Sequence, residues 1–136
     1  MNFYLSIITP EKEVYKDEVS EVVAPTIDGE IAILPNHVNL LTQIKPGELI
    51  VKKGSDYQSI AITGGFLEVN DNKVSILAPY AIKAQDIQVA RATEAKERAE
   101  KIMKEKATDK DFKIAQGELF KSLLELKIAG KHRRRY

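Results

Sequence analysis

The sequence predicts an α+β protein in which an antiparallel β-sandwich comes first and an α-helical hairpin follows. All five prolines and five of the seven glycines of this 136-residue chain lie before residue 81. Both residue types favour turns, so they indicate short strands rather than long helices. The rest of the chain contains no proline, which permits long helices. We therefore expect a sandwich domain over residues 1–83 and a helical hairpin over residues 84–136.

The two halves also differ in charge. Residues 1–80 contain 6 lysines and arginines against 11 acidic residues, a net charge of −5, whereas residues 81–136 contain 15 against 9, a net charge of +6. This asymmetry indicates two modules with different binding partners.

Composition limits the classes of protein to which the chain can belong. With 43% hydrophobic and 30% charged residues, it has the composition of a soluble globular protein. No apolar run approaches the roughly 20 residues that span a bilayer, and the N-terminus lacks the features of a signal peptide. The chain has no cysteine, which excludes disulfides and thiolate metal ligands and fits a cytoplasmic setting.

Short apolar runs with turn signals between them predict the strands of the first module. The expected strands cover residues 3–8, 14–16, 19–24, 30–33, 40–44, 48–52, 57–63, 66–69 and 74–77. A charged turn is expected at residues 16–18, and later turns at Pro46-Gly47, Gly64-Gly65 and residues 70–72. Many short strands at close spacing favour an antiparallel sandwich.

The inward-facing residues of these strands form the expected core. They are Leu5, Ile7, Val22, Ile31, Ile33, Leu49, Val51, Ile60, Ile62, Phe66, either Leu67 or Val69, Val74 and Ile76. Each such side chain contributes about 1.5–3 kcal/mol on burial. We expect this core to suffice for the first module to fold alone.

The second module is expected to form two helices. Asp86 is the expected N-cap of the first helix, in which small apolar residues, mostly alanine, recur at helical spacing. A turn at residues 108–111, with Asp109 or Asp111 as cap, leads to a second helix over residues 112–129. The apolar surface of the second helix is wider than an alanine-rich partner can cover. We therefore expect it to pack on something else in at least one state.

Three motifs together resemble a known family. The run GEIAILPNHVNLL at residues 29–41 is followed by Lys45-Pro46-Gly47 and by GGFLEV at residues 64–69. This series resembles the ε subunit of bacterial F-type ATP synthases, whose mitochondrial counterpart is called δ. The resemblance extends from about residue 5 to residue 129, in the family's order.

The resemblance implies a non-catalytic rotor subunit of the central stalk. Such a subunit helps couple proton or sodium flow to ATP synthesis, and its C-terminal helices inhibit ATP hydrolysis. By resemblance, the sandwich binds the γ subunit and the ring of c subunits, with Glu30 and His37 at that contact. The helices reach the α/β catalytic head. The protein would then lie at the cytoplasmic face of the cell membrane, held there only through the complex.

Some bacterial members of the family bind ATP at an I/L-D-x-x-R-A motif that opens the first helix. Here Arg91 and Ala92 match the motif, and Arg98 matches a later arginine, but Gln88 replaces the aspartate. Two arginines expected on the second helix correspond to Lys121 and Glu125. Because triphosphate recognition needs converging cations, the changes at Gln88 and Glu125 argue against ATP as a regulatory ligand. We expect no other cofactor and no metal.

The end of the chain is a candidate inhibitory contact. The residues that would make this contact are the apolar Leu119, Phe120, Leu123 and Leu124 and the basic Lys131, Arg133, Arg134 and Arg135. The cations also complement the negative end of the second helix dipole, and that role alone would explain them. The family resemblance adds an acidic loop of the catalytic β subunits as a partner.

An alternative interpretation is a β scaffold whose basic helical half binds nucleic acid or an acidic protein. The nine acidic residues among the cations and the lack of an aromatic platform argue against it, so we expect no nucleic-acid partner. No nucleophile with an adjacent base, metal cluster or phosphate-binding glycine loop is present in the sequence, so we expect no catalytic residues.

Overall fold

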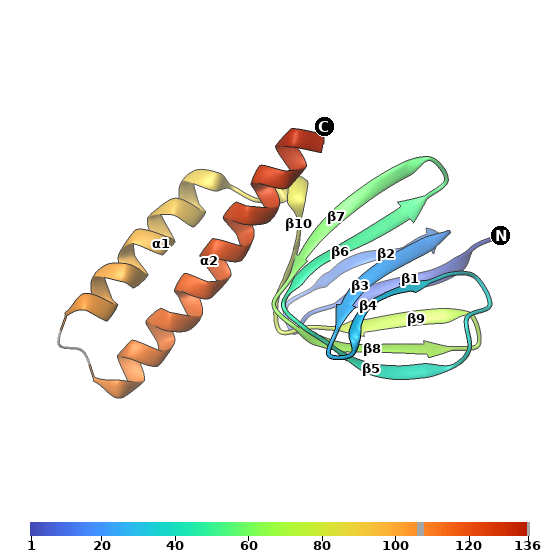
Figure 1. Cartoon of the computed structure of the whole chain (residues 1–136), viewed down its shortest axis with the longest axis horizontal. Helices are drawn as coiled ribbons and strands as arrows, with labels where there is room; N and C mark the ends of the chain where they lie inside the picture. Colours follow the sequence, from blue (N-terminus) through green and yellow to red (C-terminus); the bar gives the residue numbers. More distant parts are fainter. Residues whose placement is uncertain (106–107, 136) are drawn as a thin grey trace. The chain divides into compact units, whose positions relative to one another are not determined.

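The computed structural model describes residues 1–105 and 108–135, and the chain divides into two compact units, Met1–Lys83 and Ala84–Tyr136 (Figure 1). The first unit contains ten strands, and the second contains a short 3-10 helix and two α-helices. The predicted α+β class, with the sandwich before the helical hairpin, is confirmed.

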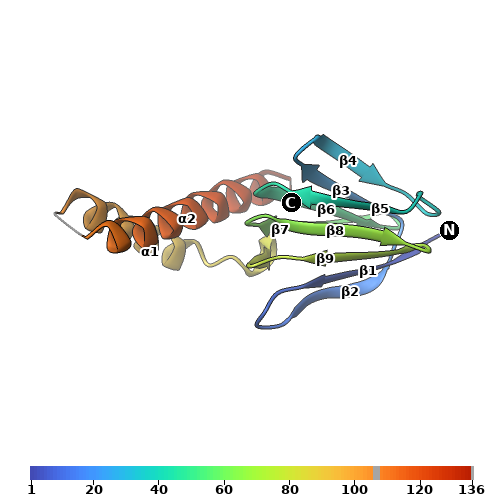
Figure 2. The same ribbon diagram turned by 90° about the horizontal axis from the view of Figure 1, so that it is seen from below.

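The strands form one sheet that folds into two layers around an apolar core. They are β1 (Phe3–Ile8), β2 (Glu13–Val19), β3 (Glu21–Thr26), β4 (Gly29–Ile33), β5 (Leu40–Ile44), β6 (Gly47–Lys53), β7 (Asp56–Ile62), β8 (Gly65–Asn70), β9 (Lys73–Leu77) and β10 (Ala81–Lys83). Their order is β10-β7-β6-β3-β5-β8-β9-β1-β2, with β4 paired to β3. Figure 2 shows β5, β8, β9, β1 and β2 following one another across one side of the unit.

The two layers meet where β3 pairs with β5 through Thr26 and Ile44. Neighbouring strands are antiparallel except β1 and β9, which run parallel. The sequence patterns did not predict this pair, because strands so far apart in the chain meet only through the tertiary fold.

Most of the expected core is buried, with two differences. Phe66 is 56% exposed, so its assignment to the core was wrong. Leu67 and Val69 of the same strand are both buried. Because successive side chains of a strand point to opposite faces, Phe66 points outward. Ile31 is only partly buried, although it packs against the core.

The turn expected at residues 16–18 is also wrong, because these residues lie inside β2. This strand is at the end of the sheet order, and charged side chains are common on edge strands, where they prevent pairing with other chains. Asp17 of β2 accepts a hydrogen bond from Lys53 of β6. That bond lowers the pKa of the Asp17 carboxyl and raises the pKa of the Lys53 ammonium group. Side chains thus link the edge strand β2 to the other layer.

The second unit contains the 3-10 helix η1 (Ala84–Asp86) and the helices α1 (Val89–Lys104) and α2 (Asp109–Arg135), which lie side by side in Figure 1. Small residues at seven-residue spacing are buried on both helices, namely Ala92 and Ala99 on α1 and Ala115 and Ser122 on α2. Side chains of this size allow the two helix axes to approach closely.

The helix ends differ from those expected. Asp86 ends η1 and does not cap α1, whose N-cap is Gln88. Thr108, rather than an aspartate, caps α2, because its hydroxyl oxygen accepts a hydrogen bond from the Asp111 amide at 3.1 Å. Helix α2 continues through Gly130 to Arg135, so the basic residues lie on the helix and not beyond it.

Gly65 is the most constrained glycine of the sandwich, and its replacement gives a test of the fold. Its φ is +138°, and a Cβ placed there would lie 2.1 Å from the Leu77 carbonyl oxygen. We predict that Gly65→Ala lowers the free energy of unfolding by at least about 2 kcal/mol. Urea unfolding followed by tyrosine fluorescence measures this, because four of the five tyrosines precede residue 84.

Gly54→Ala is the matched control, since Gly54 also has a positive φ of +62° but no atom within 4 Å of the added Cβ. It should cost about 1 kcal/mol, the penalty of the left-handed backbone alone. Equal losses in the two variants would contradict the close approach at Gly65.

Candidate functional site

Three of the sequence motifs meet at one end of the sandwich. The Ile27 amide donates to the Gln43 carbonyl at 3.1 Å, and the Lys45 amide donates to the Pro25 carbonyl at 2.8 Å. Gly64 lies beside Ile44, so close that a Cβ placed on it would be 3.5 Å from the Ile44 carbonyl oxygen. Residues 27–30, 45–47 and 64–65, distant in sequence, are thus neighbours, and we call this the motif end.

Glu30 belongs to a tight hairpin at the motif end. It is the second residue of β4, pairs with Pro25 of β3, and is exposed. The buried Thr26 hydroxyl donates to the Gly29 carbonyl at 2.6 Å and accepts from the Asp28 amide at 3.2 Å. These bonds fix the two-residue turn, so the Glu30 carboxylate is presented on a stiff support.

His37 lies at the opposite end of β4, in a turn closed by its own amide, which donates to the Leu34 carbonyl at 3.1 Å. The imidazole Nδ1 lies 2.7 Å from the Val38 carbonyl oxygen. Because a carbonyl oxygen only accepts, Nδ1 carries a proton, and Nε2 of the neutral ring is an acceptor. We call residues 34–39 and 70–72 the histidine end.

The structure does not bring Glu30 and His37 together. Residues 30–33 of β4 separate them, and a strand rises about 3.3 Å per residue, so they are roughly 10 Å or more apart along the strand. That both residues contact the c-ring or γ stays a prediction. Each residue belongs to a different end of the sandwich.

Exposed apolar side chains accompany both ends. At the histidine end, Val38 is 76% exposed and Leu34 is 52% exposed. Near the motif end, Phe66, Leu77 and Ile8 occupy successive partner positions on β8, β9 and β1 and are 56%, 55% and 39% exposed. Apolar groups gathered on a surface mark protein interaction sites. Strand alternation does not predict this row, because it does not reveal which face of a strand is covered.

The candidate nucleotide-binding residues differ in solvent exposure. Ala92 is 4% exposed, at the contact between α1 and α2, whereas Gln88 is an exposed N-cap. Arg91 and Arg98 are exposed on α1, and they lie on one side of it because seven residues make about two turns. Lys121 is half-buried on α2.

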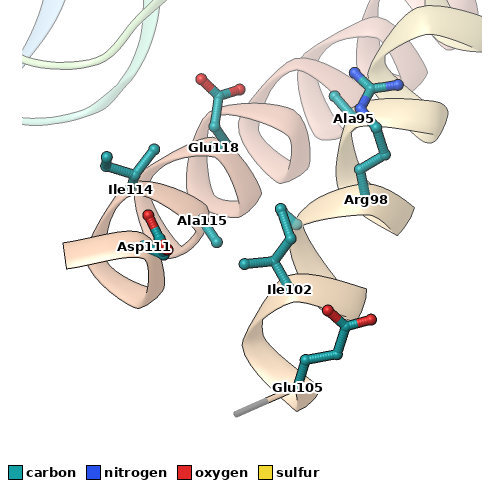
Figure 3. Close-up of a pocket in the computed structure, with 9 residues that line it drawn as sticks. Ala95, Arg98, Ile102, Glu105, Asp111, Ile114, Ala115 and Glu118 are labelled. Atoms are coloured by element: carbon teal, nitrogen blue, oxygen red, sulfur yellow. The ribbon is translucent and has the colours of Figure 1, made fainter. Parts of the chain in front are cut away.

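Arg98 contributes to a groove between α1 and α2 of about 620 Å³ (Figure 3). Ile102 and Ala115 line its apolar part, and Glu105, Asp111 and Glu118 line its polar part. A groove lined by three carboxylates and one guanidinium disfavours a triphosphate. Within the described ranges 1–105 and 108–135, no group of three histidine or acidic side chains is arranged to hold a metal ion.

The candidate inhibitory residues lie along α2. Phe120 and Leu123 are 51% and 46% exposed, three residues apart on one side of the helix, while Leu119 and Leu124 are half-buried. In the last turn, Lys131 is half-buried and Arg133 and Arg134 are exposed. The Arg135 side chain and Tyr136 lie outside the described residues. Neither α1 nor α2, as far as each is described, has the length and apolarity to cross a membrane.

Comparison with known proteins matches both units to one family. The β-sandwich domain of the ATP synthase δ/ε chain matches residues 2–84, and the long α-helix domain of the same chain matches residues 85–130. The ATP synthase epsilon chain of Dehalococcoides mccartyi is 43% identical over 131 residues, covering 96% of this chain and 94% of the relative. That of Desulforamulus reducens is 42% identical, covering 92% and 95%.

Solved structures share the fold at lower identity. A chain of the Euglena gracilis mitochondrial ATP synthase, in a structure of its OSCP, F1 and c-ring, aligns with a TM-score of 0.64 and 21% identity, covering 98% of this chain and 81% of that chain. A chain from the Tetrahymena thermophila central stalk and c-ring aligns with a TM-score of 0.57 and 19% identity, covering 93% and 95%.

None of these matches supports the alternative of a nucleic-acid-binding scaffold. Both family domains are present in their family order, and each coincides with one unit of the structure to within one residue at their junction. The chain therefore belongs to the family of ATP synthase δ/ε chains.

Proposed function

We propose that the chain is the ε subunit of a rotary F-type ATP synthase and acts there as a non-catalytic part of the central stalk. The observation that carries this proposal is the 43% identity to an ATP synthase epsilon chain over 96% of the sequence. The subunit helps couple proton or sodium flow to ATP synthesis and restrains ATP hydrolysis. It is peripheral, held at the cytoplasmic face of the membrane by the complex.

The sandwich is the docking module in this proposal. Its two ends offer two contacts of different chemistry, since Glu30 is an exposed carboxylate and His37 is flanked by the exposed apolar Val38 and Leu34. The carboxylate suits the polar loops of the c-ring, and the apolar surface suits the helices of γ. A subunit that binds both the c-ring and γ would rotate with them as one rotor.

The helical hairpin is the regulatory module. The exposed Phe120 and Leu123 form an apolar surface that a folded protein covers in at least one state. In the inhibitory state, this surface would pack on γ or the catalytic head. Arg133 and Arg134 would then lie beside acidic groups of the head and slow its hydrolysis of ATP.

The docking contacts can be tested by changing each residue alone. Glu30→Gln and His37→Ala should each weaken binding of the full chain to an ATP synthase stripped of its ε subunit by about three- to tenfold, because each removes one polar contact. Both side chains are outside the core, so the thermal midpoint should shift by less than about 2 °C. Biolayer interferometry and a thermal melt provide the two measurements.

Asp56→Asn is the control for Glu30→Gln, since Asp56 is an exposed acid at the start of β7. It should bind as the wild type does. Unchanged binding in both docking variants, or a wild-type chain that does not bind, would refute the docking proposal.

Nucleotide binding is the second test. Isothermal titration of the full chain with Mg-ATP should show no binding, or a Kd in the millimolar range or above, because three carboxylates line the same groove as Arg98. Micromolar affinity would refute this prediction. Arg91→Ala and Arg98→Ala would then identify whether the arginines of α1 form the site.

The inhibitory role of the basic end is the third test. Deleting residues 132–136 should raise ATP hydrolysis by the assembled enzyme several-fold while leaving ATP synthesis intact, because it removes the cations that hold the inhibitory state. Added salt should raise hydrolysis by the intact enzyme in the same way. If only deletion of residues 84–136 raises hydrolysis, the inhibition resides in the apolar surface and not in the basic end.

A further inference from the structure

Two turns at the histidine end are tied together by reciprocal hydrogen bonds. The Asn36 amide donates to Asn72 Oδ1 at 2.7 Å, and the Asp71 amide donates to Asn39 Oδ1 at 3.1 Å. One turn precedes β5 and the other joins β8 to β9, so each supplies an acceptor to the backbone of the other. An asparagine side chain has the acceptor and the short length that this exchange requires.

Asn72 also ties these turns to the start of the chain. Its Nδ2 donates to the Asn2 carbonyl at 3.1 Å, and its own carbonyl accepts from the Tyr4 amide at 3.3 Å. The Asn72 side chain thus contacts the turn before β5 and Asn2, while its backbone carbonyl contacts the strand β1.

The backbone of both turns needs such support. Asn36, Asp71 and Asn72 have φ values of 64°, 51° and 63°, a region that costs most residues energy but that asparagine and aspartate tolerate. Bonds exposed to water are individually weak. Because the bonds link three segments, however, loss of one loosens the support of the others.

This arrangement determines what His37 and Val38 offer to a partner. His37 Nδ1 is bound to the Val38 carbonyl, which leaves Nε2 as the ring nitrogen that can accept a hydrogen bond, and the adjacent Val38 is 76% exposed. A partner segment that brings an N–H or O–H donor beside an apolar side chain matches this pair. The match holds only if the turn keeps its shape.

We infer that Asn39 and Asn72 are positioning residues that lock the His37 turn to the β8–β9 turn and so present His37 Nε2 and Val38 to a protein segment carrying a hydrogen-bond donor and an apolar side chain. The inference rests on the proposed docking function of the histidine end. It adds that docking depends on side chains that need not touch the partner. Preorganisation of this kind lowers the entropic cost of binding.

Hydrogen exchange of the free full chain tests the lock without any partner. In Asn39→Ala, the Asp71 amide loses its acceptor and should exchange about tenfold faster, as expected for loss of one hydrogen bond. The Asn36 amide should also exchange faster, although its own acceptor on Asn72 is intact. Asn39→Asp keeps an oxygen acceptor and should exchange as the wild type does. An unchanged rate at Asn36 in Asn39→Ala would overturn the lock.

Binding to the ATP synthase stripped of its ε subunit tests the positioning role. Asn39→Ala and Asn72→Gly, which retains the positive φ, should bind about fivefold to tenfold more weakly, as loss of preorganisation predicts. Asn39→Asp should restore wild-type affinity. Ser55→Ala, in the exposed β6–β7 turn, is the control and should not change it.

The outcomes separate the two proposals. If the wild-type chain binds and Asn39→Ala binds equally well, the positioning role is wrong while the proposed function stands. If the wild-type chain does not bind, the proposed function is wrong, and the positioning role falls with it.

Discussion

The sandwich depends on one constraint, which is that a single sheet must change layers and still close around its core. Strand β3 pairs with β6 over its first three residues and then pairs with β5 at Thr26, where the two layers meet. Gly65 lets β8 begin against the carbonyl of Leu77, where no side chain fits. Strand β2 lies at the end of the sheet order and does not pair with β6 through its backbone. The hydrogen bond between Asp17 and Lys53 links these two strands instead. The motif end is therefore where the chain is least free to vary.

That constraint also determines what the sandwich can present. Because β4 is paired along its length to β3, the hairpin that carries Glu30 and the turn that carries His37 point to opposite ends of a stiff strand pair. A stiff domain with two separated contact sites suits a subunit that binds two neighbouring subunits at once. The helical hairpin follows a different principle, since its alanine contacts bury little apolar area and leave Phe120 and Leu123 exposed. Packing of this kind suits a module that changes partners.

The sequence predicted the order of the two modules, most strands and most of the core, because alternation, turn residues and the absence of proline are local signals. It failed where the answer depends on tertiary pairing. Alternation does not reveal that Phe66 of β8 lies on the uncovered face, and the charges at residues 16–18 resemble those of a turn although they belong to an edge strand. Glu30 and His37 were identified as candidates, but their separation was not, since it follows from the direction of β4. The bonds of Asn39 and Asn72 join residues more than thirty positions apart and leave no local pattern.

The central claim is that the sandwich helps couple ion flow to ATP synthesis and that the helical hairpin restrains ATP hydrolysis. Reconstitution tests this claim most directly. Membrane vesicles carrying an ATP synthase without its ε subunit would receive either the full chain or a fragment of residues 1–83, and both ATP hydrolysis and ATP-driven ion transport would be measured. The account predicts that both proteins restore transport, and that hydrolysis is slower with the full chain than with the fragment. A fragment that fails to restore transport, or equal hydrolysis with the two proteins, would contradict it.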